Sequence, residues 1–255
     1  MSVVESTTRH FIEVMGTVVT VDLFNCVDAA GASVAVEAAR ELLHEVDRIF
    51  STYKEASPLS RLRRGEISLG ETPPQVADVL DLCQRAKSLS AGWFDPWAIP
   101  GGVDPTGYVK GWAAQRALDL FRALPLSGAI VNAAGDIASF GGPTNDSVFR
   151  TGIVRPDDPQ RLAAVIELRH CLATSGEAQR GAHLFNPFTR DFASAVASAS
   201  VTGPDLGVCD ALATALSVGG HDVMVLIDVM DEYEALTIDA AGNLHATPGF
   251  PLVRD

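Results

Sequence analysis

Asp210 and Thr214 are the first candidates for metal chemistry in this chain of 255 residues. They lie four positions apart in a predicted helix over about residues 205–218, so one side chain stands above the other on the same face. That face points roughly 130° away from the centre of the helix's apolar stripe. A carboxylate and a hydroxyl arranged this way offer two hard oxygens to one Mg²⁺. The alternative is an exposed aspartate beside a threonine bonded to its own helix backbone.

A lysine flanked by glycines gives a second candidate, in the segment Asp104–Gly111. Lys110 lies where a helix is predicted to begin, and this helix is expected to run to about Ala123. A helix N-terminus and a nearby cation favour a phosphate, and glycine lets the backbone approach it. A glycine carbonyl in this turn can also bind a metal. A tight turn with a solvent-exposed lysine is the alternative.

A turn of small residues, Leu172–Gly176, precedes the segment His183–Thr189. Hydroxyls and amides of the turn can bind an anion, and His183 can act as a general base near neutral pH. Alternatively, His183 is a loop histidine without a role. Ser175 can also be interpreted as a hydrolase nucleophile, but the sequence around it lacks the G-x-S-x-G elbow.

Aromatic side chains occur in two further segments, Phe50–Tyr53 and Gly92–Asp95. An aromatic ligand can stack on such side chains, although packing in the core is the commoner reason for aromatic residues. Together, the candidate segments indicate a ligand that is anionic, aromatic and assisted by a metal. A dinucleotide meets all three demands.

These segments must be positioned by a fold that combines strands and helices. Residues 12–24 are rich in β-branched residues and predict a strand or hairpin. Apolar residues at steps of three and four predict one helix that ends near Phe50 and another that begins near Thr72. Residues 92–107 are too long and too rich in glycine and proline for a plain connection, so we expect a functional loop.

The second half of the chain is expected to consist mostly of strands. They are predicted near Ile130, Ile153, Val165, Val196, Val225 and Leu236, with a hairpin turn over Ile238–Leu244. Because strands and helices do not alternate strictly, the pattern favours an α+β fold over a doubly wound sheet.

Composition excludes several classes of function. The net charge of −13 and the pI of about 4.8 argue against binding to nucleic acid or anionic lipid. An anionic substrate would therefore need cations supplied by the site. The four cysteines are far apart and predict neither a zinc site nor a disulfide framework. The N-terminal segment lacks the pattern of a signal peptide, and no apolar run is long enough to span a bilayer. We therefore expect a cytoplasmic protein.

The order of the motifs resembles that of the ApbE family of FAD:protein FMN transferases over about residues 12–220. In chain order the motifs are Met15–Thr17, Phe50–Tyr53, Gly92–Asp95, Asp104–Gly111, Asn132–Asp136, Ala173–Gly176, His183–Pro187 and Asp210–Thr214. Each motif alone is weak, but the ordered set is specific. The strongest part is A-T-S-G, followed by H-x-x-N-P and then by D-A-L-A-T.

The resemblance implies a magnesium-dependent transferase. In such an enzyme a threonine hydroxyl of an acceptor protein attacks the FMN-side phosphorus of FAD, and AMP leaves. It implies that Asp210, Thr214 and the Gly107 carbonyl bind the metal, and that His183 is the base. The residues implied to contact FAD are Met15, Tyr53, Trp93, Phe94, Asp95, Asp104, Lys110 and Leu184.

The resemblance also implies a fold, namely a mixed sheet with flanking helices in one domain over residues 1–255. The site would lie in a cleft between two lobes, at about residues 1–125 and 126–255. The chain departs from the family pattern at Asn186, Arg190 and Ala134, where aspartate, glycine and glycine are usual. Two alternatives therefore stay open: a pyrophosphatase that splits FAD with water, and a flavin-binding module without catalysis.

Overall fold

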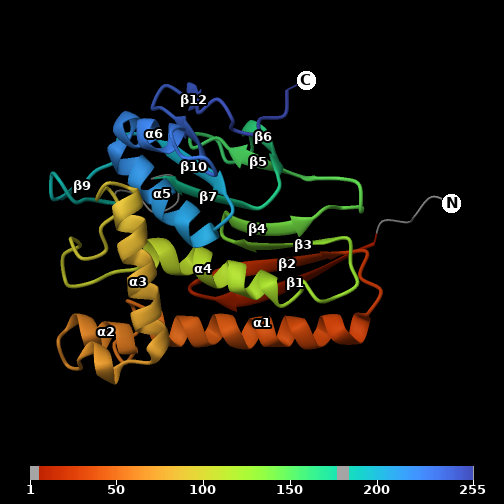
Figure 1. Ribbon diagram of the computed structural model, residues 1–255, viewed down its shortest axis with the longest axis horizontal. Coiled ribbons are helices and arrows are strands. Elements are labelled where there is room, and N and C mark those ends of the chain that lie inside the picture. The colour runs from red at the N-terminus through yellow and green to blue at the C-terminus, as the bar shows by residue number, and fades with distance from the viewer. Residues whose placement is uncertain (1–5, 177–183, 255) are drawn as a thin grey trace.

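The computed structural model describes residues 6–176 and 184–254, and it confirms the predicted α+β class (Figure 1). The helices are α1 (Ala29–Phe50), α2 (Pro58–Arg63), the short 3₁₀ helix η1 (Leu69–Glu71), α3 (Pro74–Leu89), α4 (Thr106–Asp119), α5 (Leu206–Gly219) and α6 (His221–Asp228). The strands are β1 (Thr7–Val14), β2 (Thr17–Phe24), β3 (Gly128–Ala133), β4 (Asp136–Gly141), β5 (Phe149–Val154), β6 (Leu162–Leu168), β7 (Cys171–Gly176), β8 (Phe185–Asn186), β9 (Asp191–Phe192), β10 (Ser198–Gly203), β11 (Glu234–Ile238) and β12 (Leu244–Ala246).

Eight of these strands form one sheet, in the order β1-β2-β3-β4-β7-β10-β11-β12. Neighbouring strands in the described part of the chain are antiparallel, so the sheet is antiparallel where a mixed sheet was expected. Strands β5 and β6 form a separate hairpin, and β8 and β9 form a short one. Because β2 pairs with β3 across more than a hundred residues, the sheet joins both halves of the chain.

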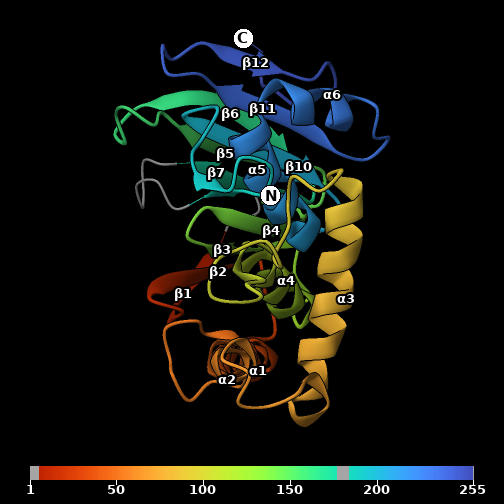
Figure 2. The ribbon, with the colours of Figure 1, turned by 90° about the vertical axis from the view of Figure 1, so that its left-hand side faces the viewer.

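Each face of the sheet is covered by a different layer. Helices α1, α4 and α5 lie on one face, where the larger apolar core forms, and Figure 2 shows them on one side of the strands. The β5–β6 hairpin packs on the other face around Phe149 and Ile166. Strand β7 shows the alternation directly, since Ala173 faces the helical layer and Leu172 faces the hairpin.

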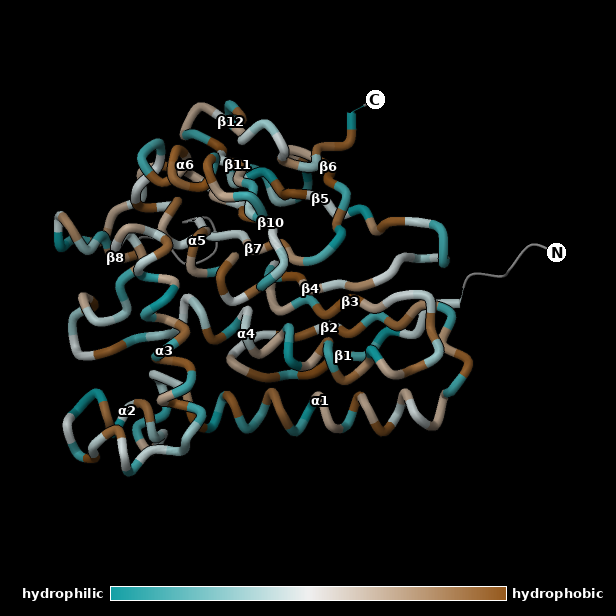
Figure 3. The backbone as a smooth tube through the Cα atoms, viewed as in Figure 1, coloured by the Kyte–Doolittle hydropathy of each residue, from teal (hydrophilic) through white to brown (hydrophobic). Residues whose placement is uncertain are grey.

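Helix α1 follows from its apolar periodicity and its cap. The Asp28 carboxylate accepts a hydrogen bond of 2.9 Å from the Gly31 amide and so caps the helix where it begins, at Ala29. Its buried residues recur at three- and four-residue steps, and apolar and polar segments alternate along it in Figure 3. The helix ends at Phe50, as predicted.

Two expectations about the elements were wrong. The strand predicted near Val225 is helix α6, in which Val223 and Ile227 are buried and Val225 is exposed. The run contains consecutive apolar residues, which fit a buried strand as well as a helix, whereas the helix buries positions four apart. Helix α4 begins at Thr106 rather than Lys110. By contrast, the strand predicted near Val196 is confirmed as β10, which begins at Ser198.

Two hairpin turns place a residue other than glycine in the left-handed region. Met15 and Gly16 join β1 to β2 with φ of 54° and 69°, and Ala134 and Gly135 join β3 to β4 with φ of 55° and 99°. Two-residue turns with both φ positive match the twist of a hairpin and strongly favour Asn-Gly. Met15 and Ala134 are therefore strained positions.

No helix in the described segments is both long enough and apolar enough to cross a membrane.

Candidate functional site

A cavity of about 1350 Å³ brings the predicted site residues together. Its walls come from the β1–β2 turn, the end of α1, residues 93–110, strands β5 and β7, and helix α5. Every predicted site residue within the described part of the chain lines it. These residues are Met15, Tyr53, Trp93, Phe94, Asp95, Asp104, Gly107, Lys110, Leu184, Asp210 and Thr214. His183, the predicted base, lies outside the described residues.

The candidate metal ligands meet where α4 crosses α5. Asp210 is only 4% exposed, so the alternative of a solvent-exposed aspartate is wrong. Helix α5 is buried on almost every side, and the face of Asp210 is turned toward α4 and the cavity instead of toward solvent. The Asp210 Oδ2 accepts a hydrogen bond of 3.3 Å from the Gly111 amide. A Cβ added to Gly107 would lie 3.1 Å from the Thr214 hydroxyl oxygen, so that hydroxyl stands directly against the Gly107 backbone.

These donors fit a hard cation. The Thr214 hydroxyl also lies 3.5 Å from that of Ser175, so two hydroxyl oxygens meet at the cavity wall, on the same helix face as the Asp210 carboxylate. Such oxygens suit Mg²⁺, which usually keeps several waters and takes few protein ligands. The described residues contain no group of three or more His, Cys, Asp or Glu side chains able to hold a metal. The candidate set therefore depends on one carboxylate supported by neutral oxygens.

Lys110 is held against a buried carboxylate behind the cavity. Its Nζ lies 2.6 Å from the Asp136 Oδ2, with the lysine side chain 26% exposed and the aspartate side chain 1% exposed. The Asp136 Oδ1 accepts a hydrogen bond of 3.3 Å from the Thr174 amide on β7. The ion pair therefore fixes the ammonium group at the cavity wall and ties it to the small-residue turn predicted to bind an anion.

The charge of the cavity bears on the ligand it can take. Its described lining contains the three cations Lys54, Lys110 and Arg155. It also contains the four carboxylates Asp47, Asp95, Asp104 and Asp210. Three positive charges against four negative ones leave a formal charge of −1. A pyrophosphate would be repelled by such a wall unless a bound cation compensated its charge.

Aromatic side chains form one side of the opening. The Trp93 and Phe188 rings pack edge to face, with centroids 4.6 Å apart, while Phe94 is buried beneath them. Phe185 and Phe192 pack in the same manner at 5.4 Å across the β8–β9 hairpin. Among the predicted stacking partners, Tyr53 differs from the rest because 90% of it is exposed. Its ring is therefore available to stack on a planar ligand.

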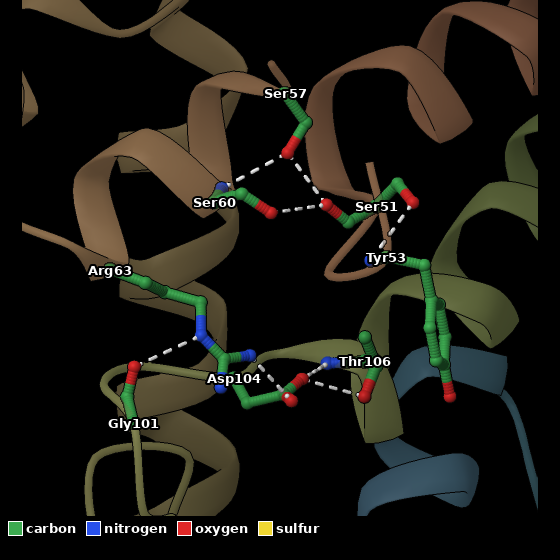
Figure 4. Close-up of polar contacts among 8 residues, drawn as sticks. All are labelled: Ser51, Tyr53, Ser57, Ser60, Arg63, Gly101, Asp104 and Thr106. Atoms are coloured by element: carbon green, nitrogen blue, oxygen red, sulfur yellow. Dashed lines mark hydrogen bonds and ion pairs between the residues drawn. The ribbon is translucent and has the colours of Figure 1, made fainter. Parts of the chain in front are cut away.

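Asp104 belongs to a polar network that joins two cavity walls (Figure 4). Its Oδ2 lies 2.7 Å from an Nη1 of Arg63, at the end of α2. Its Oδ1 accepts hydrogen bonds from the Thr106 amide at 3.0 Å and from the Thr106 hydroxyl at 2.7 Å. Arg63 also donates from Nε to the Gly101 carbonyl at 3.3 Å. These bonds explain why α4 begins four residues earlier than predicted.

The cysteines offer no thiolate to this site. Burial raises the pKa of the Cys83 thiol and of the Cys171 thiol to about 12, and burial also raises that of Cys209 well above its ordinary value. None of these thiols is among the residues that line the cavity. A cysteine nucleophile is therefore excluded for the described part of the site.

A comparison of sequence with protein-family models decides the family. The model of the ApbE family matches residues 15–101 and 99–237, which is most of the chain. The chain belongs to the ApbE family. The resemblance inferred from the ordered motifs is thereby confirmed.

Solved structures of ApbE proteins have the same fold. The flavin transferase ApbE from Vibrio cholerae matches with 20% sequence identity and a TM-score of 0.81, covering 96% of this chain and 98% of that one. The flavinyl transferase ApbE from Pseudomonas stutzeri matches with 18% identity and a TM-score of 0.80, covering 97% and 98%. The ApbE protein from Thermotoga maritima matches with 19% identity and a TM-score of 0.82, covering 95% and 97%. No curated protein sequence matches the chain.

The departures from the ApbE pattern have local explanations. The Asn186 side-chain oxygen accepts hydrogen bonds from the Phe188 amide at 3.0 Å and the Thr189 amide at 3.2 Å. An aspartate can make the same turn, so asparagine preserves the local backbone. Arg190 has a φ of 62°, the left-handed conformation for which glycine is the usual residue. Arg190 is therefore a position of backbone strain.

Sequence reasoning missed several residues of the site. Arg63, the partner of Asp104, is 41 positions away from it and belongs to a helix that was not predicted. Arg155 and its neighbours from β5 also line the cavity. The only sequence signal for Arg155 was its charge, which does not distinguish it from other surface arginines. Asp136 was noted only as part of a motif, and its pairing with Lys110 required the structure.

Proposed function

We propose that this ApbE-family protein is a magnesium-dependent FAD:protein FMN transferase. It moves FMN from FAD to a threonine hydroxyl of an acceptor protein and releases AMP. The observation that carries the proposal is the cavity, which unites all the described residues predicted to bind FAD and metal. The names of the Vibrio cholerae and Pseudomonas stutzeri relatives support flavin transfer as the type of reaction.

The proposed chemistry is a displacement at phosphorus. The threonine oxygen forms a bond to the FMN-side phosphorus, while the bond from that phosphorus to the bridging oxygen breaks. AMP leaves with the bridging oxygen, and the threonine proton passes to a base. We assign this base to His183. Such a reaction depends on positioning and charge compensation more than on a protein nucleophile.

The residues of the cavity have separate tasks in this proposal. Asp210, Thr214 and the Gly107 carbonyl would hold Mg²⁺, which supplies charge compensation to the pyrophosphate. Lys110, held by Asp136, would add a fixed positive charge. The Tyr53 ring and the aromatic side of the opening would contact the planar parts of FAD.

Roles for the other proposed FAD contacts follow from their places in the cavity. Met15 presents an apolar side chain from the β1–β2 turn. The Asp95 carboxylate is oriented by Lys87, 2.7 Å away, and by the Trp97 amide at 3.0 Å. Leu184 is buried at the start of the β8–β9 hairpin and closes the cavity wall.

One experiment separates transfer from its alternatives. The protein is incubated with FAD and Mg²⁺, with and without a threonine-bearing acceptor protein, and AMP and the acceptor's mass are measured. Transfer predicts AMP release that requires the acceptor, together with an acceptor heavier by FMN less one water. Rapid AMP release without acceptor would instead identify a pyrophosphatase. Binding of FAD without any AMP release would identify a flavin-binding module.

A further inference from the structure

The Asp104 carboxylate is engaged by the protein itself. Thr106 supplies two donors to Oδ1, and the Arg63 guanidinium approaches Oδ2 (Figure 4). Both side chains of the ion pair are largely buried, at 15% and 16% exposed. A carboxylate surrounded in this way is fixed in orientation. Through its hydrogen bonds to Thr106 it also restrains the backbone at the start of α4.

The backbone concerned is the first turn of α4. Pro105 precedes this helix and provides no side-chain cap, and Gly107 departs from helical geometry with φ of −77° and ψ of 15°. The Gly111 amide, which a regular helix directs at the carbonyl of residue 107, donates to Asp210. This turn is thus irregular at the residue whose carbonyl is the candidate metal ligand, and Asp104 is its side-chain support.

Arg63 reaches this turn from outside the cavity. None of the described residues that line the cavity belongs to α2. The start of α2 is nevertheless attached to the wall that carries Tyr53, because the Ser57 and Ser60 hydroxyls donate to the Ser51 carbonyl at 2.6 and 3.0 Å. The end of α2 is attached through Arg63 to the Gly101 carbonyl and to Asp104, in the loop before α4. Helix α2 therefore links two walls without touching the ligand space.

Close packing makes the position of Arg63 specific. A Cβ added to Gly102 would lie 3.0 Å from the Arg63 carbonyl oxygen, so the loop before Asp104 lies directly against the Arg63 backbone. Gly102 has a φ of 106°, which favours glycine there. The guanidinium then spans from the Gly101 carbonyl to Asp104, a reach and planarity that a lysine cannot reproduce.

We propose that Arg63 is a positioning residue, which acts through Asp104 and Thr106 to fix the Gly107 backbone beside Thr214. This inference rests on the proposed function, since it concerns the same metal site. It also changes the task of Asp104, from a direct contact with FAD to a support for the first turn of α4.

The test compares Arg63→Met with Arg61→Met, a matched control in the same helix whose guanidinium faces Glu66 at the surface. Hydrogen exchange of the peptide 104–111 is measured first, in the protein without FAD or metal. Arg63→Met and Asp104→Asn are each expected to speed exchange in this peptide. Arg61→Met is expected to leave it unchanged. Equal exchange in Arg63→Met and the wild type would overturn the positioning role.

The second measurement concerns the metal. Arg63→Met is expected to raise the Mg²⁺ concentration for half-maximal AMP release about tenfold, the usual loss when a partner of a metal ligand is removed. FAD affinity in EDTA, followed by flavin fluorescence, is expected to change much less. Arg63→Lys should recover part of the Mg²⁺ affinity. A loss of FAD affinity in EDTA with an unchanged Mg²⁺ requirement would overturn the proposal and return Asp104 to direct contact with FAD.

Failure of the two proposals can be told apart. If the wild type neither binds FAD nor releases AMP, the proposed function fails. The exchange experiment then still decides whether Arg63 orders the first turn of α4, because it needs neither FAD nor metal.

Discussion

Asp210 combines burial with a charge at the wall of the cavity. It is 4% exposed, and its carboxylate faces the Gly111 amide and the cavity. Burial of a carboxylate is unfavourable unless a cation or several donors compensate it. A site that keeps such a group near neutral oxygens is typical of metal binding, and the stability and activity of Asp210 variants are expected to move in opposite directions.

Asp210→Asn tests this at the residue scale. The amide can still accept from Gly111 but carries no charge, so AMP release is expected to fall about 100-fold or more. The free energy of unfolding in EDTA is expected to stay the same or rise, since a neutral amide is easier to bury. Asp205→Ala is the contrasting control, because it removes the cap that accepts from the Val208 amide. It should cost about 1 kcal/mol of stability and leave the Mg²⁺ requirement unchanged.

Lys110 gives a second prediction at this scale. Lys110→Met leaves the buried Asp136 carboxylate without its ammonium partner, and the free energy of unfolding is expected to fall by roughly 2–4 kcal/mol. The double variant Lys110→Met/Asp136→Asn removes the buried charge as well. Chemical denaturation should show that it regains most of the lost stability. FAD affinity should stay weak in both variants, and recovery in the double variant would exclude a role for the lysine charge in binding.

Turns and short helices decide where the site residues lie at the scale of elements. The β1–β2 turn holds Met15 at a φ of 54° although Asn-Gly is the favoured sequence for such a turn. Strain at a residue that lines a cavity is typical of a position selected for its side chain. Ala134 has the same backbone in the β3–β4 turn but is not among the residues that line the cavity.

This pair of turns yields a matched prediction. Asparagine tolerates the left-handed conformation, so Met15→Asn and Ala134→Asn are each expected to stabilise the protein by about 0.5–1 kcal/mol. Only Met15→Asn should weaken FAD binding, by roughly tenfold, because it removes an apolar side chain from the cavity wall. Thermal unfolding and flavin fluorescence measure the two effects. Equal FAD affinity in both variants would contradict a role for the Met15 side chain.

The same scale shows what the sequence could predict. The long, strongly periodic helix α1 was predictable, because one apolar stripe decides its packing. Helix α6 was not, since a short unbroken apolar run fits a strand as well as a helix. The start of α4 depends on Asp104, and that carboxylate is held by Arg63 from another part of the chain. Side-chain contacts between distant parts of the chain leave no periodic signal in the sequence.

The family resemblance and the order of motifs predicted a set of residues whose described members line one cavity, but they did not predict the partners of those residues. Spacing identified Asp210 and Thr214 as neighbours on one helix face, and the structure places both in the cavity. Spacing did not show that this face is buried, because burial there comes from α4. Arg63 and Arg155 were missed for the same reason, since each reaches the site through tertiary packing alone.

At the scale of the whole molecule, the site depends on the approach of two helices from distant parts of the sequence. Helices α4 and α5 pack closely where Gly111 meets Leu206 and Gly107 meets Thr214. The cavity lining carries a formal charge of −1 and the chain as a whole −13, so long-range electrostatics do not draw an anion inward. Ligand binding must then rely on the local geometry that this helix crossing provides.

Gly111→Ala tests the dependence of the site on that crossing. A Cβ at Gly111 would overlap the Leu206 carbonyl oxygen and come within 2.9 Å of its carbonyl carbon, so the backbone of one helix must shift. Overpacking of this kind is expected to lower the free energy of unfolding by about 1–3 kcal/mol. The same shift separates Gly107 from Thr214. The Mg²⁺ concentration for half-maximal activity should therefore rise even at temperatures where the variant is fully folded.

Gly70→Ala is the matched control, because a Cβ there meets no atom within 4 Å and its φ is not positive. It is expected to leave the Mg²⁺ requirement of the wild type and to change stability little. Denaturant titrations and Mg²⁺ titrations of AMP release compare the two variants at one temperature. If Gly111→Ala loses stability but keeps the wild-type Mg²⁺ requirement, the helix crossing supports the fold without setting the metal site. If stability and Mg²⁺ requirement both change in Gly111→Ala and neither changes in Gly70→Ala, the spacing of α4 and α5 sets the geometry of the metal site as well as the stability of the fold.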